Sequence, residues 1–102
     1  MRYNKLVRDK VVEILQRKGK PVKFHEAKIG EYKKKLNEKL KEETSEFLKD
    51  GSPEELVDVL EVVYALAESN GMSHSKLDLM RKKKAEYKGT FEKGIILDEV
   101  KD

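Results

Sequence analysis

The sequence contains no cysteine, which excludes disulfide bonds, thiolate nucleophiles and cysteine-ligated zinc sites. It also has no apolar run near the roughly 18 residues that a membrane-spanning helix requires. The opening residues, MRYNKLVRDK, lack the apolar centre of a signal peptide. These absences lead us to expect a cytoplasmic protein with no membrane partner.

Neither sign of charge dominates the chain. Its 102 residues carry 23 lysines and arginines against 20 aspartates and glutamates, which gives a net charge of +3. Because this excess is small and the two signs are interspersed, the composition disfavours nucleic acid as a partner. A chain of this length suits a single domain, spanning residues 1–102, with one core.

Most of the chain has the periodicity of helices, with apolar residues at spacings of three and four. The predicted helices span about Lys5–Lys18, His25–Lys49, Pro53–Asn70 and Ser73–Tyr87. The start of the first segment is also compatible with an extended chain. The expected fold is all-α, a helical hairpin or four-helix bundle. The closing segment, TFEKGIILDEV, is expected to be an extended arm that packs on the bundle or on a partner subunit.

The third predicted helix has the clearest start. Ser52 is placed to cap it, Pro53 suits the first helical position, and Glu55 suits the third position of a capping box. Gly51 is a candidate left-handed cap for the end of the preceding helix. The short connection LKDGSP therefore predicts that the second and third helices form an antiparallel hairpin.

The same helix is apolar on almost every side. Within residues 56–67 only Asp58 and Glu61 are charged. Such a helix needs burial on most of its faces, and a chain of this size offers little material for that. We therefore predict that this helix mediates a homodimer or homotetramer.

Acidic residues are concentrated in the stretch KEETSEFLKDGSPEELVDVLE, where eight of 21 positions are acidic. On the second helix, Glu43 falls within the apolar stripe and Glu46 lies three residues further on. On the third helix, Glu55 and Asp58 are also three apart, so each pair projects to one side. In an antiparallel hairpin the two pairs of carboxylates are expected to converge across one seam.

Four converging carboxylates repel one another unless they take up protons or a cation. Mg²⁺ prefers oxygen ligands, with Mn²⁺ as an alternative, so the pattern predicts a metal site. Simpler interpretations stay open. Glu55 serves as a capping residue alone, Glu42 and Glu46 pair with neighbouring lysines in solvent, and Glu61 is expected to be an ion-pair partner rather than a ligand.

Three segments of the chain resemble a known family. EETSE followed by ELVD matches the E-E-x-x-E … E-x-x-D signature of the all-α nucleoside triphosphate pyrophosphatases, the MazG-like superfamily. The opening YNKLVRDKV, the central EELVDVLEVVYALA and the closing KAEYKGTFEKGIIL are most similar to its small phosphoribosyl-ATP pyrophosphohydrolase-like subgroup. The resemblance covers most of the chain.

The resemblance implies hydrolysis between the α and β phosphates of a nucleotide, with release of pyrophosphate. It implies that Glu43, Glu46, Glu55 and Asp58 bind Mg²⁺, with Glu42 as a further candidate. Glu43 and Glu46 are then the candidate catalytic residues. Family members are dimers or tetramers with sites at or near subunit interfaces, which agrees with the apolar third helix.

A triphosphate also needs cationic contacts from the protein. The candidate substrate-binding residues are Asn4, Lys5 and Arg8 near the start and Lys84 and Lys88 near the end. Arg8 and Lys84 fall on the subgroup's pattern, and arginine suits bidentate contact with phosphate. The alternative for any of these cations is a solvated surface position, and Asn4 either orients a base or caps the first helix.

Three further functions stay open at this point. One is hydrolysis of phosphoribosyl-ATP in histidine biosynthesis, instead of the clearance of noncanonical or excess nucleoside triphosphates. Another is a non-catalytic helical interaction module that binds nucleic acid through its basic ends, which predicts salt-sensitive binding. The third is an antitoxin-like or purely structural oligomer, for which loss of the Glu43 carboxylate would be neutral or stabilising.

Overall fold

The computed structural model describes residues 3–101 and is built from four helices. These are α1 (Val11–Arg17), α2 (Ile29–Asp50), α3 (Pro53–Ser69) and α4 (His74–Lys88). Across residues 3–101 there is no β-strand. The predicted all-α class is therefore confirmed.

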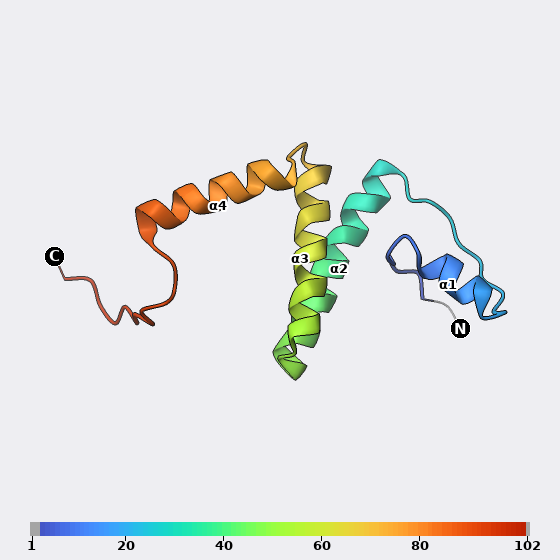
Figure 1. Cartoon of the computed structure of the whole chain (residues 1–102), viewed down its shortest axis with the longest axis horizontal. Helices are drawn as coiled ribbons and strands as arrows, with labels where there is room; N and C mark the ends of the chain where they lie inside the picture. The colour runs from blue at the N-terminus through green and yellow to red at the C-terminus, as the bar shows by residue number, and fades with distance from the viewer. Residues whose placement is uncertain (1–2, 102) are drawn as a thin grey trace.

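The α2–α3 hairpin is the centre of the molecule, and its two helices lie side by side (Figure 1). Helix α2 ends at Gly51, whose φ of 65° is left-handed and whose N–H donates to the Phe47 carbonyl oxygen at 2.7 Å. Ser52 then caps α3, because its hydroxyl accepts from the Glu55 N–H at 3.3 Å, and Pro53 is the first helical residue. The predicted connection and the caps at Gly51 and Ser52 are confirmed, whereas the Glu55 carboxylate does not complete a capping box within residues 3–101.

Replacing Ser52 by alanine is expected to lower the free energy of unfolding by about 1 kcal/mol, because one N–H of the first turn of α3 loses its acceptor. Urea unfolding followed by circular dichroism measures this loss. Ser45→Ala is the matched control, since Ser45 is exposed in the middle of α2. Equal stabilities of the two variants would show that the Ser52 hydroxyl contributes nothing as a cap.

The hydrophobic core is small and lies mainly between α2 and α3. Leu36 is 1% exposed, and Val62 and Ala67 are each 8% exposed. Helix α4 touches only α3 among the helices, and α1 touches none of them. The chain is accordingly elongated, with extents of 63 × 31 × 23 Å. A single chain therefore forms a helical hairpin with two loosely attached helices. The predicted four-helix bundle would require a second chain.

The first two helices begin later than the periodicity predicts. Helix α1 starts at Val11 instead of about Lys5, and the residues before it form neither helix nor strand, with a bend at Lys5 and a turn at Asp9 and Lys10. Residues 3–10, called here the N-terminal segment, are tied to the hairpin by the ion pairs of Lys5 with Glu42 and of Arg8 with Asp58. Helix α2 starts at Ile29 instead of about His25, and Lys28 before it has an extended backbone.

The closing residues 89–101 form no helix and extend from the end of α4 (Figure 1). Their apolar side chains are mostly in solvent: Phe91 is 98% exposed, Ile95 79% and Leu97 75%. The segment is an arm without helix or strand, with a turn at residues 91–94. Its packing on its own chain is not seen, so contact with a partner subunit stays a prediction.

No helix within the described part of the chain is long and apolar enough to cross a membrane.

Candidate functional site

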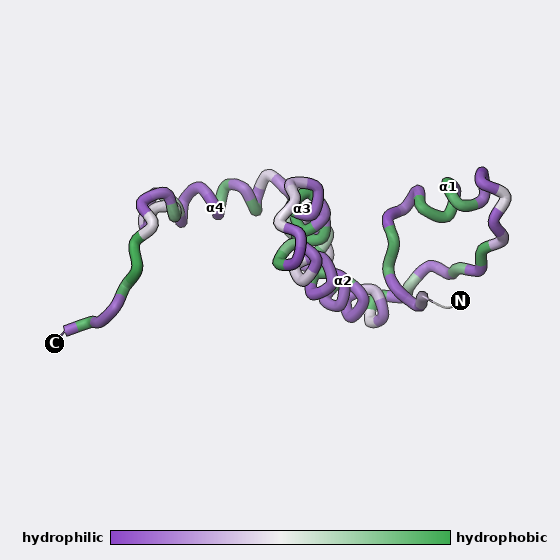
Figure 2. Tube along the Cα trace, turned by 90° about the horizontal axis from the view of Figure 1, so that it is seen from below, coloured by the Kyte–Doolittle hydropathy of each residue, from purple (hydrophilic) through white to green (hydrophobic). Residues whose placement is uncertain are grey.

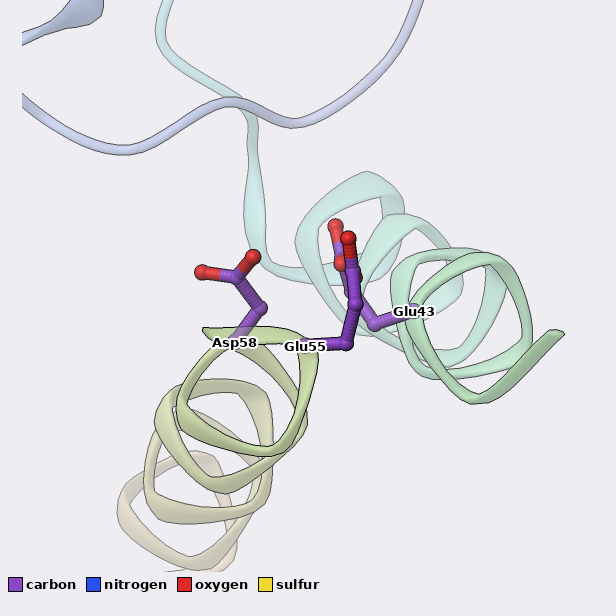
Figure 3. Close-up of side chains that lie close together, drawn as sticks. All are labelled: Glu43, Glu55 and Asp58. Carbon is purple, nitrogen blue, oxygen red and sulfur yellow. The ribbon is translucent and has the colours of Figure 1, made fainter. Parts of the chain in front are cut away.

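Three carboxylates meet where α2 ends and α3 begins. Glu43 comes from α2, and Glu55 and Asp58 come from the first turns of α3. One carboxylate oxygen of each residue lies within 4.8 Å of the others. Figure 3 shows that the three side chains point to the same side of the hairpin. The antiparallel hairpin therefore produces the predicted convergence for three of the four carboxylates.

Glu43 is the most unusual member of this acidic cluster, because it is only 7% exposed. Its Oε1 lies 3.3 Å from the Lys39 ammonium. Its Oε2 is buried and has no hydrogen-bond partner among residues 3–101, and the same is true of Glu55 Oε2. A buried charged oxygen without a partner is costly, since it has lost water and gained nothing in exchange. Glu43 thus fits a site that binds a ligand.

The electrostatic strain of the cluster is greatest at Glu55. Burial, together with the negative charges of Glu46, Glu43 and Asp58, raises the pKa of Glu55 from 4.5 to about 7. The carboxylate of Glu55 therefore tends to hold a proton near neutral pH unless another positive charge comes close. Its backbone N–H donates to the Ser52 hydroxyl, so Ser52 is the cap of α3, and the Glu55 carboxylate faces the cluster instead of closing a capping box.

The raised pKa of Glu55 predicts a pH dependence of stability. A group whose pKa is higher in the folded protein adds stability that is complete below its unfolded pKa of 4.5 and is lost as the pH rises through about 7. In a chelator, the wild type should therefore lose more stability between pH 4.5 and pH 8 than Glu55→Gln.

Urea unfolding at several pH values measures this difference. Glu54→Gln is the matched control, because Glu54 is exposed and adjacent. The same pH dependence in all three proteins would exclude Glu55 as the titrating group.

The N-terminal segment lies over the hairpin and is fixed to it by three hydrogen bonds and one further ion pair. Arg8 Nη2 donates to Asp58 Oδ1 at 2.7 Å, and Lys5 Nζ donates to Glu42 Oε1 at 2.9 Å. Lys35 Nζ donates to the backbone oxygen of Asn4 at 2.6 Å, and Asn4 has a left-handed φ of 46°. Two candidate substrate-binding cations therefore lie near the acidic cluster. Arg8 neutralises Asp58, which belongs to the cluster, and Lys5 neutralises Glu42, which lies next to it.

A cavity of about 740 Å³ lies between the N-terminal segment and the hairpin. Arg8 and Lys39 line it together with Glu43, Asp58 and apolar side chains that include Tyr32 and Leu36. Cations and carboxylates therefore face one space, beside an apolar wall. This combination suits a ligand that carries phosphates at one end and an apolar ring at the other.

Not every predicted acidic residue joins the cluster. Glu46 is exposed and lies outside the group of three, although its charge acts on Glu55. Glu42 pairs with Lys5 and, at 3.4 Å, with Lys39, and these contacts hold its pKa below the ordinary value. The lysine-paired interpretation of Glu42 is therefore confirmed.

Glu61 has the predicted ion-pair role, because its Oε1 lies 3.7 Å from Arg8 Nη1. Lys84 and Lys88 are exposed on the last turns of α4. Helix α4 begins at the end of α3 that is opposite the acidic cluster and leads away from the hairpin (Figure 1). Within one chain these two lysines are therefore not part of the cluster.

The contact between Lys39 and Glu43 was not predicted from the sequence. Lys39 is bonded to both Glu42 and Glu43 and its side chain is 17% exposed. Its position four residues before Glu43 is the signal that predicts such a contact, because residues i and i+4 share a helical face. The contact of Lys35 with Asn4 had no comparable signal, since 31 residues separate them.

The donor set matches the requirements of a hard divalent cation. All three clustered side chains offer carboxylate oxygens, and two of those oxygens are buried without partners. Mg²⁺ and Mn²⁺ prefer such ligands, and a divalent charge would remove the repulsion that raises the Glu55 pKa. Glu43, Glu55 and Asp58 are therefore the residues that fit a metal.

Comparisons of the chain with protein-family models, with curated proteins and with solved structures found no match.

Proposed function

We propose that this protein is a Mg²⁺-dependent nucleotide pyrophosphohydrolase that cleaves nucleoside triphosphates to monophosphate and pyrophosphate. The observation that carries the proposal is the buried Glu43 carboxylate, whose Oε2 has no partner within residues 3–101 and which converges with Glu55 and Asp58. For a structural oligomer or a nucleic-acid-binding module, a buried carboxylate oxygen without a partner is only a cost, whereas a bound cation would compensate it.

In this proposal, Glu43, Glu55 and Asp58 hold Mg²⁺ or Mn²⁺. A cation bound there would neutralise the charge of phosphate oxygens and activate a water molecule. Lys39 fixes the orientation of Glu43 through its contact with Oε1. Glu46 is exposed beside the cluster, so its carboxylate is able to accept a proton from water and release it to solvent.

The cations of the N-terminal segment are proposed to bind the phosphates. Arg8 lines the cavity beside Asp58, and its planar guanidinium matches phosphate oxygens in a bidentate manner. Lys5 borders the same cavity as a point charge. Asn4 is exposed at the start of this segment and is the candidate contact for the base.

A homo-oligomer is part of the proposal. Helix α3 packs on α2 with one face and leaves Leu56 51%, Val57 60% and Leu60 48% exposed on the rest of its surface. An apolar surface of this kind on a small protein marks an interaction site. A second hairpin packed there would complete a four-helix bundle. Any contribution of Lys84 and Lys88 to a site would then come from another copy.

Replacing Val57 by lysine is expected to shift the protein from a dimer or tetramer to a monomer, because it places a charge within this apolar surface. Light scattering after size exclusion measures the mass. Glu54→Lys is the matched control, since Glu54 lies one turn earlier on an exposed position. A wild-type protein that is monomeric at all concentrations would contradict the proposed assembly.

The test of the proposed activity is incubation of the pure protein with Mg²⁺ and a panel of nucleoside triphosphates, deoxynucleoside triphosphates and phosphoribosyl-ATP. Release of pyrophosphate from one or more triphosphates is the expected result, and the preferred member identifies the base and sugar. Preference for phosphoribosyl-ATP would assign the protein to histidine biosynthesis instead. No release from any member of the panel would exclude the proposed activity.

A further inference from the structure

Helix α4 is incompletely packed in a single chain. It spans 15 residues, none of them buried, and α3 is the only helix that it contacts. A helix of this length is marginal in water without tertiary support. The hydropathy of the chain in Figure 2 shows that α4 is largely polar, while the closing residues beyond it contain an apolar stretch. The exposed apolar stretch indicates that the closing residues need a further surface.

An apolar groove of about 450 Å³ separates α3 from the first turns of α4. The groove is lined by Leu60, Val63, Tyr64, Leu77, Asp78 and Arg81. Leu60 also belongs to the exposed apolar face of α3, so the groove continues the proposed surface of self-association. Helix α4 carries four consecutive cations, Arg81–Lys84. Arg81 lines the groove, and Arg81 and Lys82 pair with Asp78 at 2.9 and 3.2 Å, while Lys83 and Lys84 add two further positive charges.

The closing residues have the chemistry that complements this groove. Ile95, Ile96 and Leu97, called here the apolar triplet, are 75–79% exposed. Asp98 and Glu99 follow directly, and they have the charge that α4 attracts.

The triplet does not reach the groove of its own chain in this structure. A turn closed by the Gly94 N–H and the Phe91 carbonyl oxygen, 3.1 Å apart, precedes it, and Gly94 has a left-handed φ of 59°. With this turn in place, the segment leads away from α3 (Figure 1). In this conformation, any segment that fills the groove belongs to another molecule.

We propose that the apolar triplet of one copy of this chain occupies the α3–α4 groove of a second copy, and that the exchange is reciprocal. Ile95–Leu97 fill the apolar groove, while Asp98 and Glu99 pair with the cations of α4 in the other copy. A short segment alone buries less than the roughly 800 Å² per partner of a stable interface. In a two-fold exchange each contact occurs twice, and the arm of each copy also covers part of α4 of the other copy. The exchange rests on the proposed self-association.

Cross-linking between engineered cysteines tests this exchange, because the natural chain has none. One full-length variant carries Ile96→Cys, and a second, lengthened by an affinity tag, carries Val63→Cys. The two are mixed, equilibrated and oxidised. A disulfide-linked species with the summed mass of the two different chains is the expected result. The pair Leu97→Cys and Leu60→Cys repeats the test at the next contact.

Lys93→Cys in place of Ile96→Cys is the matched control, since Lys93 is exposed within the turn. It should give at least tenfold less of the mixed species. Equal cross-linking of the control would overturn the proposal, as would the absence of a mixed product from both test pairs. A double variant carries both Val63→Cys and Ile96→Cys. If its disulfide forms only within one chain, each arm folds back on its own groove and the exchange is overturned.

The mass of the unmodified protein in solution separates this result from the proposed self-association. If the unmodified protein is a dimer or tetramer but the cysteine pairs do not cross-link, only the exchange is overturned. If the unmodified protein is a monomer, both the exchange and the proposed self-association are overturned.

Discussion

Replacing Glu43 by glutamine is expected to reduce pyrophosphate release at least 100-fold and to remove the stabilisation of the protein by Mg²⁺. Glutamine has nearly the same shape but no charge, so the cluster loses the carboxylate with the buried, unpartnered oxygen. A 100-fold loss corresponds to about 2.7 kcal/mol of transition-state stabilisation, which is reasonable for the removal of one ligand of a catalytic cation. Steady-state kinetics and melting curves with and without Mg²⁺ measure the two effects.

The same substitution should have the opposite effect on stability in a chelator. Without a divalent cation, the Glu43 charge is buried beside Glu55 and Asp58, and its removal relieves repulsion. Lys39, which lies 3.3 Å from Glu43, stays paired with Glu42 and so is not left as an isolated charge. Glu43→Gln is therefore expected to be at least as stable as the wild type in a chelator and less stable in Mg²⁺. A simple packing defect would lower stability under both conditions.

Glu38→Gln serves as the matched control, because Glu38 is exposed on the same helix and lies outside the cluster. It should retain both turnover and the stabilisation by Mg²⁺. Full activity of Glu43→Gln would contradict a role of this carboxylate in catalysis.

Arg8→Gln is expected to bind Mg²⁺ or Mn²⁺ about tenfold more tightly and yet to turn over more slowly. The Arg8 guanidinium, 2.7 Å from Asp58, competes with any other cation for that carboxylate. Single and double positive charges roughly 5 Å apart repel by about 1.7 kcal/mol even in bulk water, enough for a tenfold change in affinity. Turnover falls because the proposed phosphate contact is lost.

Isothermal titration with Mn²⁺ measures the affinity, and initial rates measure the turnover. Lys5→Gln is the control for the affinity, since Lys5 pairs with Glu42, which lies outside the three clustered carboxylates. Its effect on Mn²⁺ binding should be smaller than that of Arg8→Gln. Weaker binding of Mn²⁺ by Arg8→Gln would show that Arg8 supports the cation site instead of competing for it.

The features that were predictable from the sequence depend on local geometry. The left-handed cap at Gly51 and the cap at Ser52 follow from the turn chemistry of a short connection. The burial of Glu43 follows from its position within an apolar helical stripe. Because both caps fix an antiparallel hairpin, the convergence of Glu43 with Glu55 and Asp58 was also predictable.

The features that were not predictable depend on contacts between distant parts of the chain. The pairing of Arg8 with Asp58 joins residues 50 positions apart, and it ties the N-terminal segment to the hairpin where the periodicity suggests a helix. Glu46 lies three residues after Glu43 on neighbouring positions of α2. Glu43 is buried but Glu46 is exposed, because α3 packs against only part of the surface of α2. The direction of α4, and hence the place of Lys84, depends on the connection after α3.

Product analysis by ³¹P nuclear magnetic resonance tests the central claim most directly. The wild type and Glu43→Gln are each incubated with Mg²⁺ and the triphosphate that the panel identifies as the best substrate. The expected spectrum shows monophosphate and pyrophosphate for the wild type and unchanged triphosphate for Glu43→Gln. Formation of diphosphate and orthophosphate, or the same products from both proteins, would contradict a pyrophosphohydrolase built on the acidic cluster.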